Sequence, residues 1–450
     1  MALLSLHQTA DTIREFASLV TDASTDYDPL IEMVGDAQFV LLGESTHGTH
    51  EFYNARAEIT KRLITEKGFN VIALEADWPD ALRVNRYIRG GDQDDTANEA
   101  LSEFKRFPTW MWRNADIVGF IGWLRAHNAT TRNHPSWNNV GLYGLDLYSL
   151  HSSIDAVIRY LQKMDPEAAK EARMRYSCFE HFGDDAQTYG LTASQHKSLS
   201  CEDVVVEQLV ELQKRSADFL MRDGRAAADE LFFAEQNALI AKNAEQYYRA
   251  MYRGRPNTWN LRDTHMVNTL DRLMDHFRVQ GEAPKAVVWA HNSHLGDARA
   301  TQMTSRGEVN VGQLIRERHG DEAILVGFTT ATGTVTATSD WGDPAERKQV
   351  RQPLQDSYEE LMHDVGIPNF MIAIRDNRSL RRALTPELLE RAIGVVYRPE
   401  TERWSHYFSA NLAEQFDALI HFDESRAVEP LERTSQWDEG ELPETYPTAL

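Results

Sequence analysis

The chain has 450 residues, of which 42% are hydrophobic, so it is long enough for one large or two ordinary domains with a sizeable core. Its 47 lysines and arginines stand against 69 aspartates and glutamates, which gives a formal net charge of −22. This charge argues against nucleic acid or an anionic membrane surface as the main partner, whereas a neutral or cationic ligand is easier to accommodate.

The sequence has no stretch that predicts export or membrane insertion. The N-terminus lacks a basic segment followed by a long apolar run, and no window approaches the length of a membrane span. Cys178 and Cys201 are the only cysteines, too few for a disulfide framework. We therefore expect a cytoplasmic protein in a reducing compartment.

The first predicted elements are helical and lead to a buried strand. Apolar residues at helical spacing predict an entry helix within residues 5–20 and a helical turn over residues 29–34. Residues 39–42 are four consecutive apolar residues, which is typical of a strand buried on both faces of a parallel sheet.

Ionisable residues follow this strand directly. Glu44, His47 and His50 come where open α/β sheets bind ligands, at the carboxyl edge. Capping of the next helix by Ser45 or Thr46 is the simpler interpretation. It explains the two hydroxyl residues but not the carboxylate and the imidazoles.

Residues 50–66 predict an amphipathic helix that stops at Gly68. Arg56 lies four residues after Phe52 and three before Ile59, so it projects into the apolar stripe. A guanidinium there needs a carboxylate or an anionic ligand, because burying an unpaired charge is costly. A side chain that extends along the stripe to reach water is an equally good explanation.

The next strand repeats the first pattern. Residues 70–74 are followed by Glu75, and the helix between the two strands predicts a right-handed βαβ unit. Glu44 and Glu75 are then expected at the same edge of the sheet, on adjacent or near-adjacent strands. A helix cap or a surface carboxylate is the alternative for Glu75.

An aromatic cluster separates two predicted helices, residues 79–90 and 117–127. The cluster spans residues 107–114 and includes Trp112 and Arg113. Aromatic side chains around an arginine could wall a pocket for a bulky apolar substrate, and ordinary packing between helices explains them equally well.

A third strand, within residues 141–148, contains Asp146, which could instead serve a local turn or cap. Residues 151–280 show apolar positions at helical spacing and no strand-like alternation, which predicts a helical subdomain. Within it, residues 259–265 are unusually polar at the start of a helix, and N-capping by Asp263 is the simplest explanation.

The strand pattern returns at residues 285–290 and ends in His291 and His294. A single core histidine would be unremarkable, but a pair directly after a core strand favours a functional interpretation.

Further strands complete the predicted sheet. Residues 323–328 and 332–338 are expected to form a strand that runs into a hairpin through 329–333. Additional short strands are predicted at residues 370–374, 392–396 and 418–422. From residue 424 onward the chain is acidic and poor in apolar residues, which predicts a loosely packed polar tail.

These elements predict an α/β protein with a central, largely parallel sheet flanked by helices. We expect its N-terminal part in residues 1–150, a helical subdomain in 151–280, the C-terminal part of the core in 281–423 and the polar tail in 424–450. The sequence makes no prediction of the oligomeric state.

The strand-end residues suggest a hydrolytic site. A histidine held by a carboxylate can take a proton from water near neutral pH, and the second histidine pair or Arg56 can stabilise a developing oxyanion. The same residues could instead hold Zn or Mn. Ser45 is a weak candidate nucleophile, because His47 replaces the glycine that closes a nucleophile elbow. The candidate cluster is Glu44, His47, Arg56, Glu75, His291 and His294.

The order of these motifs resembles the erythromycin esterase family. The match rests on Gly43-Glu44-Ser45-Thr46-His47-Gly48, Arg56, Glu75, Tyr143-Gly-Leu-Asp146 and His291-Asn-Ser-His294. The resemblance implies hydrolysis of a macrolide lactone by water that His47 activates, with the other five residues of the cluster in support and no metal or other cofactor. Such an activity would confer antibiotic resistance.

We therefore expect a carboxylic ester hydrolase that acts on a bulky ester or lactone. Its additional substrate-binding residues would be His50, Trp112, Arg113 and Asp146. Two alternatives stay open: a divalent-metal-dependent hydrolase with a different substrate, and a non-catalytic accessory protein that binds a polyketide or saccharide.

Overall fold

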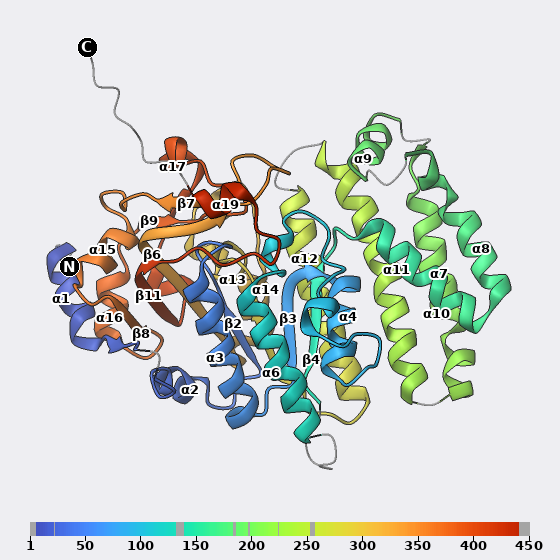
Figure 1. The fold of residues 1–450 in the computed structure, drawn as a ribbon, viewed down its shortest axis with the longest axis horizontal. Helices are drawn as coiled ribbons and strands as arrows, with labels where there is room; N and C mark the ends of the chain where they lie inside the picture. Colours follow the sequence, from blue (N-terminus) through green and yellow to red (C-terminus); the bar gives the residue numbers. More distant parts are fainter. Residues whose placement is uncertain are drawn as a thin grey trace.

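The computed structural model describes residues 6–21, 23–131, 139–182, 186–196, 199–223, 225–252 and 257–440. Within these ranges the chain forms one large sheet, one small sheet and helices that flank them (Figure 1). The large sheet contains β1 (Ser18–Leu19), β2 (Phe39–Leu42), β3 (Val71–Asp77), β4 (Gly141–Asp146), β5 (Ala286–Trp289), β6 (Ala323–Ala337), β7 (Glu346–Val350), β8 (Asn369–Ala373) and β11 (Ala418–Ser425).

The small sheet pairs β9 (Leu388–Arg391) with β10 (Tyr407–Ala410). The helices of the described ranges are α1 (Leu6–Phe16), α2 (Asp28–Val34), α3 (His50–Lys67), α4 (Trp78–Ile88), α5 (Ala97–Ala100), α6 (Ala115–Thr131), α7 (Leu150–Met164), α8 (Pro166–Tyr176), α9 (Ala186–Gln195), α10 (Glu202–Asp223), α11 (Arg225–Met251), α12 (Asn257–Val279), α13 (Asn292–Leu295), α14 (Val311–His319), α15 (Tyr358–Asp364), α16 (Arg378–Leu384), α17 (Glu402–Ser405), α18 (Leu412–Gln415) and α19 (Ser435–Glu439).

The large sheet is mostly parallel. Its neighbouring strands β11, β6, β2, β5, β3 and β4 all run in the same direction, in that order. β8 and β1 extend one edge with antiparallel pairing, and β7 pairs antiparallel with the end of β6. The predicted α/β fold with a central, largely parallel sheet is therefore confirmed.

Apolar residues on alternate positions of each strand build two cores, one on each face of the sheet. In β2, Val40 and Leu42 join the core under α3 and α6, whereas Phe39 and Leu41 join the core under α12 and α14. All four are fully buried. Burial of each such side chain stabilises the fold by about 1.5–3 kcal/mol, which is why this unbroken apolar run forms a central strand.

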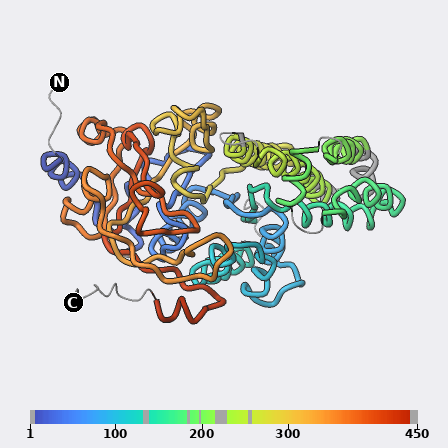
Figure 2. Tube along the Cα trace, turned by 90° about the horizontal axis from the view of Figure 1, so that it is seen from above, coloured from blue at the N-terminus to red at the C-terminus, as the bar shows by residue number. Residues whose placement is uncertain are grey.

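The helices α7 to α11 extend from one end of the molecule, away from both described termini (Figures 1 and 2). They have a hydrophobic core of their own, made of residues such as Leu161, Ala172 and Ala241. The following helix, α12, instead packs on the sheet through Met266 and Leu270. The predicted helical stretch thus contains both an extension and a helix of the α/β core.

Two observations bear on the expected compartment. Cys178 and Cys201 form a disulfide within the helical extension, with their Cα atoms 6.1 Å apart. The small cysteine count therefore carries no argument for a reducing compartment. In the described ranges, the helices are all too short or too polar to traverse a lipid bilayer.

Two of the expected strands differ in the structure. β6 continues without a hairpin through residues 329–333, because these residues keep their parallel pairing with β11. The hairpin turn lies instead between β6 and β7. Residues 392–396 are irregular, and their backbone bonds to loops at Thr46 and Thr338 rather than to a strand of the sheet.

The C-terminal segment is also more ordered than predicted. Ala427 and Pro430 form β-bridges to Thr49 and Asn114, and Trp437 of α19 is buried. The prediction of a loosely packed tail is therefore wrong for residues 424–440, because a few apolar side chains anchor this segment. Residues 441–450 lie outside the described part of the chain.

Candidate active site

The sheet topology explains why the predicted residues meet. β5 lies between β2 and β3, and the last residues of β2 and β5, Leu42 and Trp289, are aligned with Leu74 near the end of β3. The segments that follow them therefore leave the same edge of the sheet side by side. His291 is consequently placed between Glu44 and Glu75.

Two glycines allow the loop after β2 to pack closely. A Cβ atom at Gly43 would lie 2.2 Å from the Asn292 Oδ1 atom, and one at Gly48 would lie 1.8 Å from the Thr336 carbonyl oxygen. The backbone N–H of Asn292 donates to the carbonyl of Glu44 at 2.7 Å. The loops after β2 and β5 are thus locked together at the backbone.

Glu44 joins an imidazole to a buried guanidinium. Its Oε1 atom lies 2.9 Å from the His47 Nδ1 atom, and its Oε2 atom lies 2.6 Å from the Arg56 Nη2 atom. The Arg56 side chain is 0% exposed and stacks between the rings of Tyr53 and Trp289, with its Cζ atom 4.6 and 4.9 Å from the two centroids.

This arrangement decides between the two interpretations of Arg56. The side chain has a carboxylate partner and does not extend to water. Because it is 0% exposed and does not line the neighbouring cavity, its position argues against direct stabilisation of an oxyanion and favours a positioning role behind Glu44.

His291 is a neutral ring beside His47. The centroids of the two rings are 4.9 Å apart. Burial is the main cause that lowers the pKa of His291 to about 3, and the neighbouring His47 acts in the same direction. The backbone N–H of Ser293 donates to its Nδ1 atom at 3.2 Å, so the proton of the neutral ring lies on Nε2.

The Nε2 atom of His291 is available as a donor. It is buried and makes no well-formed hydrogen bond within the described residues, although the Ser45 carbonyl is close enough to influence the ring. A buried N–H without a good partner is costly, although His291 is not among the residues that line the neighbouring cavity.

His294 has the opposite charge state. Burial acts against its protonation, but Asp263 and Glu75 raise the pKa of His294 to about 9. Its Nδ1 atom lies 2.9 Å from the Asp263 Oδ1 atom, its Nε2 atom lies 3.4 Å from the Glu75 Oε1 atom, and the Trp259 ring stacks on it at 4.5 Å. The two carboxylates therefore favour the protonated ring at neutral pH, against the effect of Arg262, whose Nη1 atom lies 3.1 Å from Nε2.

Arg262 connects two further carboxylates. Its Nη2 atom donates to Glu75 Oε1 at 2.6 Å and to Asp146 Oδ2 at 2.7 Å, and its Nε atom donates to Asp146 Oδ1 at 3.0 Å. Burial acts to raise the pKa of Glu75, but the charges of His294 and Arg262 hold it well below its usual value. The second oxygen of Glu75 accepts the backbone N–H of His291 at 2.9 Å.

A cavity of about 180 Å³ lies beside these groups, and Glu44, Arg56, His291 and His294 are not among the residues that line it. Of the predicted residues, His47, Glu75, Trp112 and Asp146 line it directly. The rest of its lining includes Asp77, Asp80, Phe104, Arg106, Phe107, Met111, Tyr148, Arg262, Trp341 and Val395.

Two predicted substrate-binding residues lie elsewhere. The His50 Nδ1 atom is 2.9 Å from the Asp116 Oδ2 atom, and Arg113 forms an ion pair with Glu432. Neither side chain is among those that line the cavity. Their carboxylate partners come from α6 and from the C-terminal segment, which draw them away.

The sequence interpretation missed Arg262 and Asp263 as site residues. Asp263 is not the N-cap of α12, because it lies in the second turn, where it also accepts the backbone N–H of Val311 at 3.1 Å. The available signal was the polar run of residues 259–265, which is unusual on a helix that packs on a sheet. Arg106, paired with Asp77 at 2.7 Å, had no comparable signal.

The sequence left open the alternative that these residues hold a divalent metal. Across the described ranges, no group of three or more His, Cys, Asp or Glu side chains is arranged so that it could hold a metal ion. In the cluster itself, one nitrogen of His47 and one of His294 are already bonded to carboxylates.

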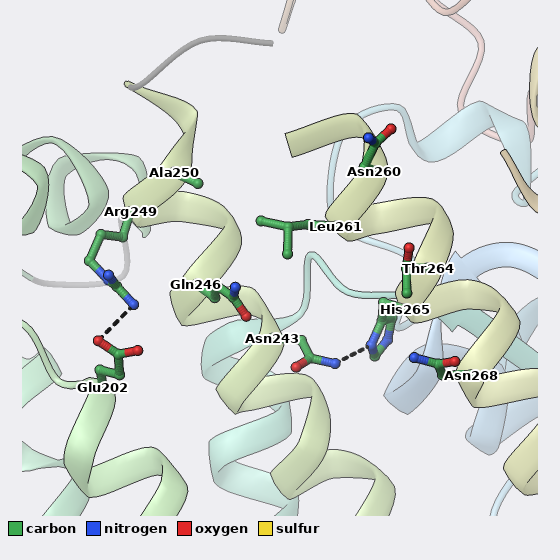
Figure 3. Close-up of a pocket in the computed structure, with 10 residues that line it drawn as sticks. All are labelled: Glu202, Asn243, Gln246, Arg249, Ala250, Asn260, Leu261, Thr264, His265 and Asn268. Atoms are coloured by element: carbon green, nitrogen blue, oxygen red, sulfur yellow. Dashed lines mark hydrogen bonds and ion pairs between the residues drawn. The ribbon is translucent and has the colours of Figure 1, made fainter. Parts of the chain in front are cut away.

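A second and larger hollow, about 580 Å³, lies between α11 and α12 and shares no residue with the first (Figure 3). Figure 3 shows amide side chains, the hydrogen bond from Asn243 to His265 and the ion pair of Arg249 with Glu202. Burial lowers the pKa of His265 to about 4. No carboxylate contacts this ring among the residues that line the hollow, so it lacks the pairing seen at His47.

Comparison with known proteins supports the family that the sequence motifs predict. The family model described as erythromycin esterase matches residues 64–425. A relative from Escherichia coli, named erythromycin esterase type II, is 21% identical over 425 residues, which span 91% of this chain and 94% of the relative.

Two solved structures share the fold. A succinoglycan biosynthesis protein has a TM-score of 0.77 at 22% identity, with coverage of 95% of this chain and 100% of that one. An erythromycin esterase mutant in its open conformation has a TM-score of 0.62 at 18% identity, with coverage of 92% and 96%. At these identities the two structures show the fold alone.

Proposed function

This chain belongs to the erythromycin esterase family, as its motifs predicted, and from that membership we propose that it hydrolyses a carboxylic ester or lactone with water that His47 activates. The family supports a hydrolase. The roles of the residues and the identity of the substrate are inferred from the chemistry of the site.

One observation carries the proposal: His47 lines the cavity while its Nδ1 atom is held by Glu44, which is itself ion-paired with Arg56. The bond to Glu44 keeps the ring proton on Nδ1, so Nε2 has the free lone pair. A neutral imidazole oriented in this way is the arrangement that general-base catalysis requires.

The reaction then proceeds in two steps without a covalent enzyme intermediate. The water oxygen forms a bond to the acyl carbon while one water proton moves to the His47 Nε2 atom. The bond between the acyl carbon and the leaving oxygen of the tetrahedral intermediate then breaks. The leaving oxygen receives the proton from Nε2 as it departs. The products are a carboxylic acid and an alcohol, or a hydroxy acid from a lactone.

Two groups are suited to stabilise the negative charge of the intermediate. Arg262 lines the cavity, and the neutral His291 ring beside His47 has its proton on Nε2, which makes no well-formed hydrogen bond in the described residues. Donors that are fixed before the reaction stabilise a developing oxyanion most effectively. Glu75, Asp263 and His294 act as positioning residues for these two groups.

The cavity limits the part of the substrate that enters. Its volume of about 180 Å³ is below the range typical of sites for drug-sized ligands. Phe107 and Trp341 contact each other with ring centroids 4.8 Å apart, and both line the cavity. A macrolide lactone therefore requires these two aromatic residues to separate, whereas a small ester does not.

The test is a panel of macrolides and small esters, with products identified by mass spectrometry. Hydrolysis adds one water to the substrate, and we expect turnover that survives exhaustive dialysis against a strong chelator. Loss of turnover on chelation with recovery on addition of Zn or Mn would establish the metal-dependent alternative. Ligands that raise the melting temperature but yield no acid would indicate a binding protein.

A further inference from the structure

The lining of the cavity has more carboxylates than guanidiniums. Four acidic side chains contribute to it and only two basic ones, Arg106 and Arg262. The acidic side chains are Glu75, Asp77, Asp80 and Asp146. Arg56 and His294 do not correct this excess, because Glu44 and Asp263 already balance them. A cation would therefore be attracted to this cavity.

Asp77 presents an unused acceptor. Its Oδ2 atom accepts a hydrogen bond from the Arg106 Nε atom at 2.7 Å, and the side chain is only 5% exposed. Its Oδ1 atom is buried and has no hydrogen-bond partner in the described residues. A buried carboxylate oxygen without a partner is costly, and here it belongs to a residue that lines a cavity.

Asp80 lies three residues further along, in the first turn of α4, and lines the same cavity. Residues three apart at the start of a helix share one side, so the two carboxylates approach the cavity together. Arg106 is bonded to Asp77 and forms no ion pair with Asp80. Asp80 therefore has no directly bonded cation in the described residues.

The remaining wall suits an ammonium group. Trp112, Phe107 and Trp341 line the cavity with aromatic rings. Aromatic faces next to carboxylates attract organic ammonium ions, because the negative face of the ring adds to the charge attraction.

We propose that Asp77 and Asp80 form a subsite for a protonated amine, and that the substrate of this chain is an ester that carries an ammonium group near its carbonyl. The substrate assignment rests on the proposed function, because the same small cavity must hold the ester. The amine subsite itself does not depend on hydrolysis.

Asp80 adds a pH dependence to this binding. Burial is the main cause that raises the pKa of Asp80 to about 8. The charges of Asp77 and Glu103 also raise this pKa, whereas those of Arg106 and Lys105 lower it. The empty cavity thus holds a proton on Asp80 at neutral pH. An ammonium ion displaces that proton, so its affinity rises up to about tenfold per pH unit between pH 6 and 8.

The experiment compares 2-(dimethylamino)ethanol with its uncharged carbon isostere, 3-methylbutan-1-ol, by titration calorimetry on the full chain at pH 6, 7 and 8. The amine stays protonated over this range, and neither compound has an ester bond. Asp80→Asn and Asp77→Asn are the test variants. Glu103→Gln is the matched control, because Glu103 is near Asp80 but does not line the cavity.

We expect the amine to bind at least about tenfold more tightly than the alcohol at pH 8, with weaker binding at pH 6. Asp80→Asn should remove both the preference and its pH dependence, whereas Glu103→Gln should keep them. Equal binding of the two compounds, failure of the amine to bind, or a preference that survives both Asp variants would overturn the subsite. Ester hydrolysis without an amine preference would overturn only this inference, and amine binding without hydrolysis would overturn only the proposed function.

Discussion

The loop after β2 and the loop after β5 both place histidines at the same edge of the sheet, yet their rings have different surroundings. His47 contacts one carboxylate, Glu44, which already has a guanidinium partner. His294 lies between two carboxylates and is protonated at neutral pH. His291 bonds to no carboxylate through its ring and is neutral.

This difference shows how the same residue type can serve three roles in one small site. The number of carboxylates that touch a buried imidazole decides whether it is a base, a neutral donor or a fixed cation. The strand ends supply the histidines together with Glu44 and Glu75, whereas Asp263 comes from α12, and α3 supplies Arg56, which holds Glu44.

The largest loss of stability is expected at Arg262, because its guanidinium is the shared partner of buried carboxylates at the ends of β3 and β4. Arg262→Met leaves Glu75 and Asp146 buried without their shared partner, which should lower the free energy of unfolding by about 3–5 kcal/mol in urea titrations. Arg278→Met, an exposed ion pair on the same helix, should cost under about 1 kcal/mol. Equal losses in the two variants would contradict this account of α12.

Substitutions in the loop after β2 should instead lower the rate of hydrolysis. Glu44→Gln can present an amide N–H to the His47 Nδ1 atom, which favours the wrong tautomer, and should reduce kcat/KM by about 10²-fold or more. The variant also leaves Arg56 unpaired. The double variant Glu44→Gln/Arg56→Met should therefore recover melting temperature but not rate. Recovery of rate in the double variant would show that Glu44 acts only through stability.

The charge of His294 should appear in the pH dependence of stability. Its folded pKa, about 9, is above the ordinary value of 6.5, so its stabilising contribution is complete below pH 6.5 and is lost as the pH rises through 9. The difference in melting temperature between the wild type and His294→Gln should shrink over this range. A difference that stays constant from pH 6 to 9.5 would mean that the ring is not charged in the folded state.

The smallest effects are expected outside the cavity. His50→Ala and Arg113→Ala remove contacts to Asp116 and Glu432, away from the groups that line the cavity. Each should leave kcat/KM within about threefold of the wild type. A hundredfold loss of kcat/KM in either variant would show that the residue does contribute to substrate binding.

Much of the site could be predicted because its signals are local. A carboxylate or a histidine lies at or within two residues of the end of β2, β3, β4 and β5, and parallel strands bring their carboxyl ends to one edge. The two glycines of the β2 loop and the stop of α3 at Gly68 are equally local.

The rest could not be predicted, because it depends on contacts between distant segments. Arg262 reaches Glu75 across 187 residues, and no spacing rule relates a residue of α12 to the end of β3. Arg56 could not be assigned from its helix alone, because its carboxylate partner, Glu44, lies in the preceding loop and helical spacing does not relate the two. The long β6 strand and the anchored residues 424–440 likewise follow from pairing with segments far along the chain.

The central claim is that the imidazole of His47 takes the proton from the attacking water. The most direct measurement is kcat/KM of His47→Ala, with the ester identified by the panel, in the absence and presence of added imidazole. We predict a loss of about 10³-fold with an unchanged melting temperature, and a recovery of at least about tenfold when imidazole enters the vacated space. Hydrolysis by a folded His47→Ala protein at close to the wild-type rate, without imidazole, would contradict the account.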